Sequence, residues 1–590
     1  MKRTLLLFAL CALGTLGFAA ADPMRPHLET RHGVRQLIVN GQPFLILGGE
    51  LHNSSSSSRD YMKPVWPRLV AKKLNTVLAA VTWELLEPAE GRFDFSVVDE
   101  LIQDARQNQL HLVFLWFGSW KNGESSYPPA WVKTNSQRFP LAQKASGENL
   151  NVLSTFGAAT RDADARAFAA LMHHIREVDG RDHTVLMIQV ENEVGVLGDS
   201  RDHSPAANEA FAQAVPKELM DYLQQHKDTL APELREAWTA NGAKTAGTWT
   251  EVFGRSRPAE FILHYDLTEE EQRTELKKFH WPGDEVFMAW QYARYVNQVT
   301  AAGKAEYDIP MYANGWLQQA TLPWPGTYPS GGPVPQVADV WRCGAPAVDL
   351  LAPDIYVPDF AETCEKWTRN GNPLFVPEAD GRGPATANVL TAIIKHNAIG
   401  FSPFGIDGRA GPQPEETPQP GAPRPVDALA ESYAVLTYLA PVILENQGRG
   451  TMAVLPPAGG PDDPPQQVKL GDYNVEVTYA TPPHFGPPPA PGQPAPPSPF
   501  GPPPNPFPGR LIINTGPDEF LIVGGNMNLK ITATAPGPKT VRLLSCKEIM
   551  LQDGKWIPGR QLNGDETEHN RRWPFFRPLG IYRVKVYRRD

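Results

Sequence analysis

The sequence predicts an α/β protein: a (β/α)8 TIM barrel followed by a C-terminal all-β, sandwich-like domain. From residue 43 onward short apolar runs alternate with amphipathic stretches, and this alternation repeats eight times, as expected of parallel strand–helix units. From residue 448 onward the pattern changes to alternating strands broken by Gly and Asp turns, which predicts the second domain. The chain has 590 residues, more than the ~250 that one domain usually holds.

The barrel strands are expected where apolar runs lie between turn residues, and the helices where apolar residues recur at helical spacing. The predicted strands are 43–50, 75–83, 110–117, 185–193, 309–316, 348–356, 373–380 and 398–407, and the predicted helices are 95–109, 164–178, 359–370, 385–396 and 428–446.

Three further segments complete the expected organisation. The barrel is expected to span residues 22–447, with an inserted helical segment at about 195–284, which is too long for a simple connection. The second domain spans 448–590 and contains a loop at 482–508 in which 15 of 27 residues are proline, so that it cannot form a strand ladder. Strands of this domain are expected at 473–479, 510–515, 528–534 and 580–587.

The N-terminus resembles an export signal. Lys2 and Arg3 precede an apolar run over 5–18, and small residues lead to a cleavage site after Ala21, so residues 1–21 are expected to be a secretory signal peptide. No later apolar run reaches the ~20 residues of a membrane span. We therefore expect an exported protein, periplasmic or extracellular, with no membrane partner. The net charge of −10 argues against nucleic acid as a partner.

The cysteines predict no metal site and no disulfide scaffold. Cys343, Cys364 and Cys546 remain after the signal peptide, and none lies in a CxxC pair. Cys343 and Cys364 could form a disulfide in an oxidising compartment, and the sequence leaves this open. The oligomeric state is also left open.

Two glutamates at predicted strand ends are the candidate catalytic residues. Active sites of TIM barrels lie at the C-terminal ends of the strands, where Glu193 ends the fourth strand and Glu378 lies near the end of the seventh. Retaining glycoside hydrolysis needs two carboxyl groups ~5–5.5 Å apart, one to attack the anomeric carbon and one to protonate the leaving oxygen. Asn192 is placed to bond the sugar 2-hydroxyl, and Tyr356 to hold the attacking carboxylate.

Other strand-end residues are expected to contact the sugar, because aromatic faces pack against sugar C–H groups and polar groups bond hydroxyls. Glu191, two residues before Glu193, is expected to be a structural carboxylate and is the alternative acid if the assignment is displaced. The further substrate-binding candidates are Trp316, Trp83, Trp120, Glu50, His52, Asn314 and Asp380.

Several motifs resemble glycoside hydrolase family 35, the β-galactosidases. The run 189–195 (QVENEVG) resembles the family's acid/base motif, and the stretch from Leu74 to Phe95, including Trp83, resembles a second-strand signature shared with family 42. Residues 129–131 (PAW) match a third-strand motif, and the second domain resembles the β-rich tail of a bacterial subgroup. The resemblance implies a retaining exo-β-galactosidase without cofactor, with Glu193 as acid/base and Glu378 as nucleophile.

This chain departs from family 35 at Asn53, Ala80 and Ser119, positions that line the sugar pocket in the family. The galactose contacts therefore do not carry over at these positions. The subgroup resemblance suggests terminal galactose of plant cell-wall xyloglucan side chains as the substrate. An exo-β-glycosidase for glucosamine or arabinopyranose, or a non-catalytic glycan-binding protein, are the alternatives.

Overall fold

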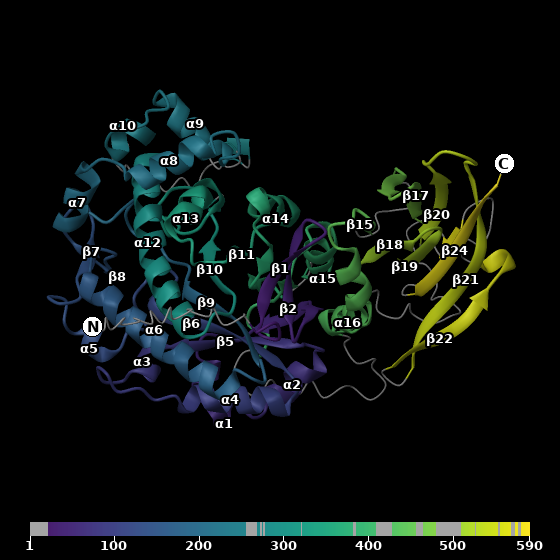
Figure 1. Ribbon diagram of the computed structural model, residues 1–590, viewed down its shortest axis with the longest axis horizontal. Coiled ribbons are helices and arrows are strands. Elements are labelled where there is room, and N and C mark those ends of the chain that lie inside the picture. Colours follow the sequence, from purple (N-terminus) through teal and green to yellow (C-terminus); the bar gives the residue numbers. More distant parts are fainter. Residues whose placement is uncertain are drawn as a thin grey trace, which may run out of the picture.

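The protein is described by a computed structural model in which a barrel and an all-β domain lie side by side along the longest axis (Figure 1). The structure describes residues 22–590 except 255–267, 269, 272–273, 275–277, 320, 382–384, 409–426, 456–463, 480–508, 526, 553–554, 568–572, 576–579 and 590. The predicted signal peptide at 1–21 and the proline-rich loop at 482–508 lie outside the described residues.

Parallel strands close into a ring and confirm the predicted barrel. The seventh strand is split by Pro377, which has no N–H to donate to a ladder. Its first half pairs with the eighth strand and its second half with the sixth, so the ring still closes. The ring consists of β4 (Ile46–Glu50), β5 (Thr76–Thr82), β6 (His111–Lys121), β9 (Val185–Asn192), β10 (Met311–Trp316), β11 (Leu350–Ile355), β12 (Phe375–Val376), β13 (Glu378–Ala379) and β14 (Gly400–Phe401).

Helices follow most barrel strands. Of the five predicted helices, those at 95–109, 164–178 and 359–370 differ from the structure by a few residues at their ends. The helix predicted at 385–396 ends at Leu390 and continues as a π turn, Thr391–Lys395, and 428–446 agrees at both ends. The helices are α1 (Arg59–Met62), α2 (Val65–Ala71), α3 (Trp83–Leu86), α4 (Ser96–Gln107), α5 (Ala130–Lys133), α6 (Ala158–Asp179), α12 (Pro282–Glu306), α13 (Ala338–Gly344), α14 (Phe360–Trp367), α15 (Ala385–Leu390) and α16 (Ala428–Asn446).

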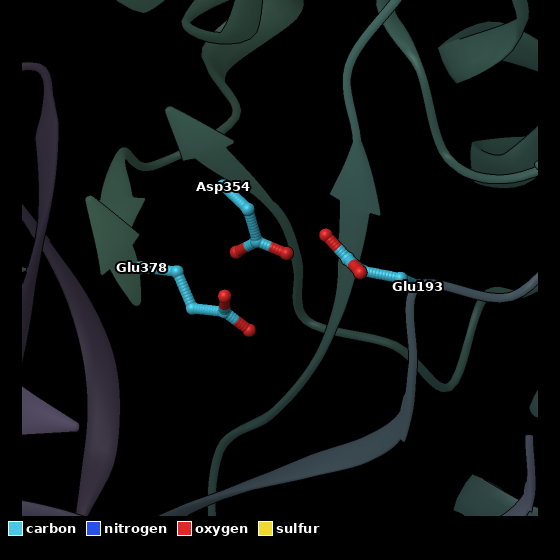
Figure 2. Close-up of side chains that lie close together, drawn as sticks. All are labelled: Glu193, Asp354 and Glu378. Atoms are coloured by element: carbon cyan, nitrogen blue, oxygen red, sulfur yellow. The ribbon is translucent and has the colours of Figure 1, made fainter. Parts of the chain in front are cut away.

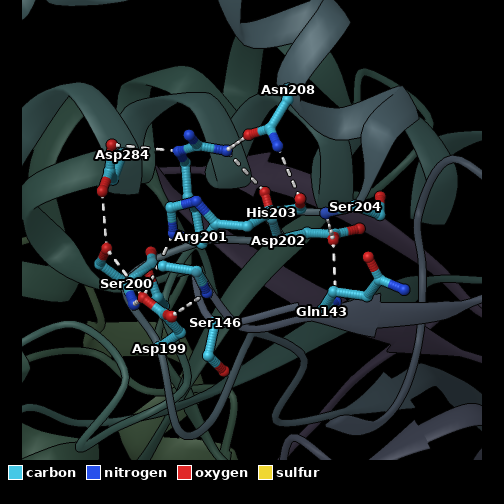
Figure 3. Close-up of polar contacts among 12 residues, drawn as sticks. Gln143, Ser146, Asp199, Ser200, Arg201, Asp202, His203, Ser204, Asn208 and Asp284 are labelled. Atoms are coloured by element: carbon cyan, nitrogen blue, oxygen red, sulfur yellow. Dashed lines mark hydrogen bonds and ion pairs between the residues drawn. The ribbon is translucent and has the colours of Figure 1, made fainter. Parts of the chain in front are cut away.

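The long insertion after β9 is helical over much of its described length. It contains α7 (Pro205–Ala212), α8 (Lys217–Gln225), α9 (Pro232–Ala240) and α10 (Trp249–Phe253), which lie together at one edge of the barrel (Figure 1). Polar contacts hold the start of the insertion in place (Figure 3). Ser200 donates a hydrogen bond to Asp284 at the start of α12, at 2.6 Å, and Asp202 accepts from the Gln143 N–H at 3.1 Å. These contacts fix the position of the chain just beyond the C-terminal end of β9.

A three-stranded N-terminal sheet, which the sequence analysis did not predict, packs against the barrel. β1 (His27–Arg31), β2 (Val34–Val39) and β3 (Gln42–Phe44) are joined by tight turns at His32-Gly33 and Asn40-Gly41, where φ is positive at all four residues. Leu37 and Val39 belong to one apolar cluster with buried residues of the barrel strands, such as Ile46, Val113 and Phe375. A second short hairpin pairs β7 (Leu141–Gln143) with β8 (Asn149–Leu153).

The C-terminal domain is antiparallel throughout its described strands and confirms the predicted all-β class. Its sheet folds around an apolar core that includes Val475, Phe520, Leu529 and Val584. The strands are β15 (Met452–Leu455), β16 (Gln466–Leu470), β17 (Tyr473–Tyr479), β18 (Arg510–Gly516), β19 (Glu519–Val523), β20 (Met527–Ala533), β21 (Thr540–Gln552), β22 (Lys555–Leu562), β23 (Trp573–Phe575) and β24 (Ile581–Arg589).

Helix α16 joins the two parts of the molecule. It has the length and mean hydropathy, 1.3, of a membrane span, but Tyr433 and Leu436 are buried against the barrel, and Tyr433 donates a hydrogen bond to the Gly48 carbonyl at 2.8 Å. Tyr438 on the same helix packs against Trp556 of the β-domain, with ring centroids 5.0 Å apart. The apolar surface of α16 is thus used between the two parts of the protein.

Candidate active site

Three buried carboxyl groups meet at the C-terminal mouth of the barrel (Figure 2). Glu193 follows β9, Asp354 lies in β11, and Glu378 opens β13 as the register partner of Asp354. One oxygen from each carboxyl lies within 4.8 Å of the others, and each side chain is buried. The predicted pair Glu193 and Glu378 therefore lies together, from strands far apart in the chain.

The backbone of Glu193 is held in a conformation that ordinary side chains seldom adopt. Its φ is +44°, in the left-handed region, and its N–H donates to Asn314 Oδ1 at 3.0 Å. Its carbonyl accepts the Gly123 N–H at 3.0 Å, from a turn in which Asn122 and Gly123 both have positive φ. These two bonds direct the Glu193 carboxyl into the mouth of the barrel.

The environment of Glu193 suits a general acid. Burial, together with the negative charge of Glu378, raises the pKa of Glu193 to about 7, while the Lys121 ammonium acts in the opposite direction. Asp354 shares a hydrogen bond with Glu193, and burial raises the pKa of Asp354 well above its usual range, with further contributions from Glu378 and Glu193. A hydrogen bond between two carboxyls requires a proton on at least one of them. The site therefore holds a proton at neutral pH.

The environment of Glu378 instead favours an oriented carboxylate. The Tyr356 hydroxyl donates to its Oε2 at 3.0 Å, and Asn192 Nδ2 donates to its Oε1 at 3.3 Å. The ammonium of Lys121 lies 4.0 Å from Oε1. Donors and a cation directed at one carboxylate stabilise its negative charge and fix its orientation.

Lys121 is the functional residue that the sequence analysis missed. It ends β6 and is only 7% exposed. Burial alone lowers the pKa of this ammonium, but the carboxylates of Glu378, Glu193 and Glu50, with Asp354, outweigh burial and raise it. A Lys after Trp at the end of an apolar run looks like an ordinary solvated residue, so no sequence signal marked it. Asp354 was likewise not among the predicted site residues.

Glu50 contributes a further carboxyl beside the pair. It is fully buried, and neither of its carboxylate oxygens has a hydrogen-bond partner in the structure. Burial, and then the charge of Glu378, raises its pKa well above the usual range. A buried carboxyl without a partner is costly unless a ligand or a proton satisfies it. Glu50 therefore lies beside the carboxyl pair without a partner, and its predicted contact with the sugar stays a prediction.

Of the remaining predicted sugar contacts, Asn314 organises the carboxyl cluster, whereas Trp316, Asp380 and His52 are partly buried side chains at or beyond strand ends. Asn314 donates to Asp354 at 2.6 Å as well as accepting from the Glu193 backbone, so it organises the site. Trp316, at the end of β10, is partly buried, and Asp380 is partly buried just beyond β13. His52 contacts Asp407 through its Nδ1 at 2.9 Å, and its side chain remains 39% exposed.

The expectation that Trp83 and Trp120 offer open faces to a sugar is wrong. Both side chains are fully buried. Trp83 begins α3, and its Nε1 donates to Glu87 at 2.8 Å. Trp120 packs between Tyr292 and Tyr295 and donates to the Leu153 carbonyl at 3.0 Å. Both rings belong to the core because β5 ends one residue earlier, and β6 extends further, than predicted.

Glu191 and Ser119 are structural in this fold. Glu191 accepts the Trp120 N–H at 2.8 Å and is fully buried, where desolvation and the nearby Asp164 raise its pKa well above the usual range. Ser119 donates to Asp164 at 2.6 Å and also bonds Tyr295. Ser119 therefore lies in the core rather than among the residues around Glu378.

The other two positions at which this chain departs from family 35, Asn53 and Ala80, lie near a separate, small depression. Asn53 and Ala80 line it together with Ser56 and Ser57, and Ser56 donates to the Ala80 carbonyl at 2.7 Å.

The cysteines Cys343, Cys364 and Cys546 are buried and free, so Cys343 and Cys364 are not joined in this structure.

The three carboxyls could also hold a metal ion by their spacing alone. The donors Asn192 and Tyr356 already bond both oxygens of Glu378, and Lys121 supplies a cation beside it. This arrangement of one proton-bearing carboxyl beside one fully hydrogen-bonded carboxylate is suited to paired acid and nucleophile chemistry.

Comparison with known proteins points to the same chemistry. Residues 57–321 match the family model of glycoside hydrolase family 42, described as Beta-galactosidase. Residues 429–574 match a Domain of unknown function, DUF5597, which spans α16 and much of the β-domain. The matching model is that of family 42, so the narrower resemblance to family 35 stays a prediction.

A curated relative has the same description. The chain is 29% identical over 224 residues to a Beta-galactosidase from Xanthomonas manihotis, a match that covers 35% of this chain. The match spans about a third of that relative's length, 33%.

Among solved structures, the chain is similar to a β-galactosidase from Bacillus circulans sp. alkalophilus, with 15% identity, a TM-score of 0.43, and coverage of 68% of this chain and 57% of that one. It is also similar to the β-galactosidase from Rahnella sp. R3, with 16% identity, a TM-score of 0.41, and coverage of 67% and 56%. A β-amylase catalytic domain from Paenibacillus polymyxa gives the same TM-score, 0.41, at 12% identity, and covers 61% of this chain and 92% of that one.

Proposed function

We propose that this protein is a retaining, exo-acting β-galactosidase that removes terminal β-D-galactose from oligo- or polysaccharides. The observation that carries the proposal is the separation of the two carboxyls, whose nearest oxygens lie within 4.8 Å. Retaining enzymes hold the two groups ~5–5.5 Å apart, whereas inverting enzymes leave ~6.5–9.5 Å for a water molecule. The family model matched by residues 57–321 supports the same activity.

In the first step, a Glu378 carboxylate oxygen attacks the anomeric carbon. The bond from that carbon to the leaving oxygen breaks, and Glu193 gives its proton to that oxygen. The product is a covalent galactosyl-enzyme and a free leaving group. The Tyr356 and Asn192 donors and the Lys121 ammonium hold Glu378 in position for the attack.

In the second step, Glu193, now ionised, takes a proton from water as the water oxygen attacks the anomeric carbon. The bond to Glu378 breaks, so the enzyme returns to its starting state and galactose leaves with its original configuration. The same residue acts as acid and then as base because its pKa of about 7 lies near neutral pH.

Terminal galactose on xyloglucan side chains is the proposed natural substrate, and the predicted signal peptide supports export to the periplasm or beyond. Both proposals rest on the sequence. One observation favours a second sugar, glucosamine. The unpartnered Glu50 carboxyl, close to Glu378, could pair with a sugar ammonium as well as with a hydroxyl.

A panel of 4-nitrophenyl β-glycosides tests the activity and the sugar together. The panel contains the galactoside, glucosaminide and arabinopyranoside, and is assayed with wild type and with Glu193→Gln and Glu378→Gln. Glu84→Gln is a matched control, because Glu84 is also a carboxyl just beyond a barrel strand but bonds Lys133 away from the site. Release from the galactoside, lost in both site variants and kept in the control, is the expected result.

Two further results decide the remaining alternatives. Proton NMR of the fresh product should show β-galactose before it equilibrates, as retention requires. Fresh α-galactose would rule out the double displacement. Release from the glucosaminide in place of the galactoside would transfer the same mechanism to an amino sugar. No release from any glycoside or galactosyl oligosaccharide would favour a glycan-binding protein.

A further inference from the structure

The last strand of the β-domain carries cations on its outer face. The even-numbered residues of β24 from 582 to 586 are buried in the core of the domain. The residues on the opposite face are Arg583, Lys585, Tyr587 and Arg589, and all four are exposed. Because successive strand residues point to opposite faces, three cations and a tyrosine lie in one row on the solvent side, at intervals of about 7 Å.

The neighbouring strand β21 adds another cation to this face. Lys547 is exposed and lies directly opposite Arg583 in the antiparallel register. The other cross-strand neighbours are Gln561 for Lys547 and Leu521 for Arg583, so neither cation faces a carboxylate directly. Within the described part of the chain, neither has an ion-pair partner. Like charges directly opposite each other destabilise a sheet, and a bound anion would relieve this repulsion.

The same face presents an aromatic ring. Tyr587 is 39% exposed, one of the large hydrophobic residues that the fold leaves at its surface. An exposed ring can pack against the C–H face of a sugar, while Lys and Arg form charge-assisted hydrogen bonds with carboxylates. We refer to this surface as the β24 basic face, which consists of Lys547, Arg583, Lys585, Tyr587 and Arg589.

An acidic residue neutralises part of the β24 basic face. Glu519 lies opposite Lys585 on β19, and the two side chains form an ion pair at 3.3 Å. The cations of Lys547 and Arg583 are thus the ones available to a ligand.

The charge of the whole chain is divided in the same way. Residues 448–590 contain 16 Lys and Arg against 12 Asp and Glu, whereas residues 22–447 contain 37 against 53. The β-domain is therefore net positive and the barrel strongly negative. Opposite charge in two parts of one chain indicates that the basic part has a polyanionic partner.

The β24 basic face extends toward the outer end of the molecule. Ile581, at the start of β24, belongs to the apolar cluster that includes α16, and the strand then runs away from the barrel to the C-terminus (Figure 1). A ligand bound along β24 toward Arg589 is thus held at the end of the β-domain that is distant from the barrel.

Among polyanions, an acidic polysaccharide fits the β24 basic face best. A flexible chain with one carboxylate on each uronic acid unit can contact the end of the β-domain and still avoid the negative barrel. A membrane surface is extended and would repel the barrel as well. A nucleic acid offers no reason for the exposed tyrosine beside the cations, and the predicted signal peptide leads away from it.

We propose that the β24 basic face binds an acidic polysaccharide through its uronate carboxylates, and so holds the protein on carbohydrate that contains the galactosides it cleaves. The choice of a polysaccharide rests on the proposed galactosidase function and on the predicted export. Binding at this face does not involve Glu193 or Glu378, so the two proposals can be tested separately.

Neutralising the like-charge pair tests the proposal. The double variant Lys547→Gln/Arg583→Gln removes two cations from the face. Its control, Lys469→Gln/Lys530→Gln, removes two exposed cations from β16 and β20 of the same domain. Binding is measured as the retardation of the full chain in native gels that contain polygalacturonate, with dextran as the neutral polymer and with increasing salt.

We expect polygalacturonate, and not dextran, to retard wild type and the control. The Lys547→Gln/Arg583→Gln variant should bind about 10-fold or more weakly, the loss of two charge-assisted contacts, and salt should weaken binding by wild type. The melting temperature of this variant should not fall, because the substitutions remove a repulsion. Both double variants should hydrolyse 4-nitrophenyl β-galactoside as wild type does.

Four results would contradict these expectations. No retardation of wild type, or equal weakening in the two double variants, would overturn the proposal. Tighter binding to DNA, or to vesicles that contain phosphatidylglycerol, than to polygalacturonate would assign the face to another polyanion and also overturn it. Retardation without nitrophenol release from any glycoside would leave the binding face standing and overturn the galactosidase function instead.

Discussion

The mouth of the barrel and the β-domain each contain a buried acidic group, and the two groups differ in whether the fold supplies a partner. At the mouth of the barrel, Glu50 has no partner for either oxygen, and Asp354 leaves its Oδ1 without one. In the β-domain, the buried Glu548 accepts from Arg560 at 3.2 Å. An unsatisfied buried carboxyl costs stability. A ligand or a proton at Glu50 would relieve a cost that the Arg560 contact already relieves at Glu548.

The largest expected effect comes from removing either member of the carboxyl pair. Glu378→Ala should lower kcat by at least about 10⁴-fold, as loss of a nucleophile does, and Glu193→Ala by about 10²–10⁴-fold, as loss of an acid/base does. Azide identifies the roles, since it replaces the missing group. With Glu193→Ala it should yield β-galactosyl azide from the covalent intermediate, and with Glu378→Ala, α-galactosyl azide by direct attack.

The azide products also identify any exchange of roles. An α-azide from the Glu193 variant would make Glu193 the nucleophile and reverse the assignment. Glu191→Gln serves as the comparison, because Glu191 holds the Trp120 backbone in place from outside the reacting pair. It should lose stability, with no azide product.

A smaller, pH-dependent effect is expected from Lys121→Met. The ammonium lowers the pKa of Glu193, which stands at about 7, so its removal raises that pKa. Since the first step needs protonated Glu193, wild-type kcat/KM should fall as pH rises through about 7, and this fall should move to higher pH in the variant. The absolute rate should drop about 10–100-fold as Glu378 loses its cation. Stopped assays with the aryl galactoside between pH 5 and 9 provide both values.

Lys121→Arg and Lys133→Met are the controls for that experiment. Arg keeps the charge and should restore the pH profile in part, whereas Lys133 pairs with Glu84 at 3.0 Å outside the site and should not matter. An unchanged profile in Lys121→Met, with only a lower melting temperature, would make Lys121 a structural residue.

Glu285 extends the comparison to stability. Burial raises its pKa to about 8, above the usual 4.5, although bonds from Tyr328 and Gln336 act in the opposite direction. A raised pKa favours the folded state fully below about 4.5, and this contribution is lost as pH rises to about 8. The free energy of unfolding of wild type should therefore fall by a few kcal/mol between pH 5 and pH 9. Glu285→Gln should not show this fall. Urea titrations at both pH values measure it, and parallel losses in the two proteins would contradict it.

The smallest effect is expected in the β-domain. Arg560→Ala leaves the buried Glu548 without this cation, so the urea midpoint should fall slightly, while kcat/KM stays within about twofold because the pair is distant from the reacting groups. A marked loss of activity would show that the β-domain contributes directly to the site.

The sequence predicted the pair of catalytic candidates because strand ends in a barrel meet at one face, whatever their distance in the chain. Helix α16 agrees with its predicted range at both ends, and in the structure the Asp427 side chain caps its first turn by accepting from the Leu429 and Ala430 N–H groups. The N-terminal hairpin was missed although Asn40-Gly41 is a strong turn signal. Its strands are short, and their partners are visible only in three dimensions.

Side-chain environments were harder to predict than the fold. Trp83 looked like a strand-end aromatic, but the chain turns into α3 at that residue. Lys121 looked solvated because its burial depends on Glu378, more than 250 residues later in the chain. Which carboxyls lack partners likewise depends on contacts between distant strands, which a single sequence does not record.

The strand order also has a consequence for biosynthesis. Barrel closure joins β4 to β14, so the chain must have emerged from the ribosome as far as residue 401 before the ring can form. The β-domain waits longer, because β24, Ile581–Arg589, lies between β19 and β21 in its sheet. Until then, the edges of those two strands that pair with β24 have no partner. We expect nascent chains of this protein to depend on chaperones chiefly during this last interval.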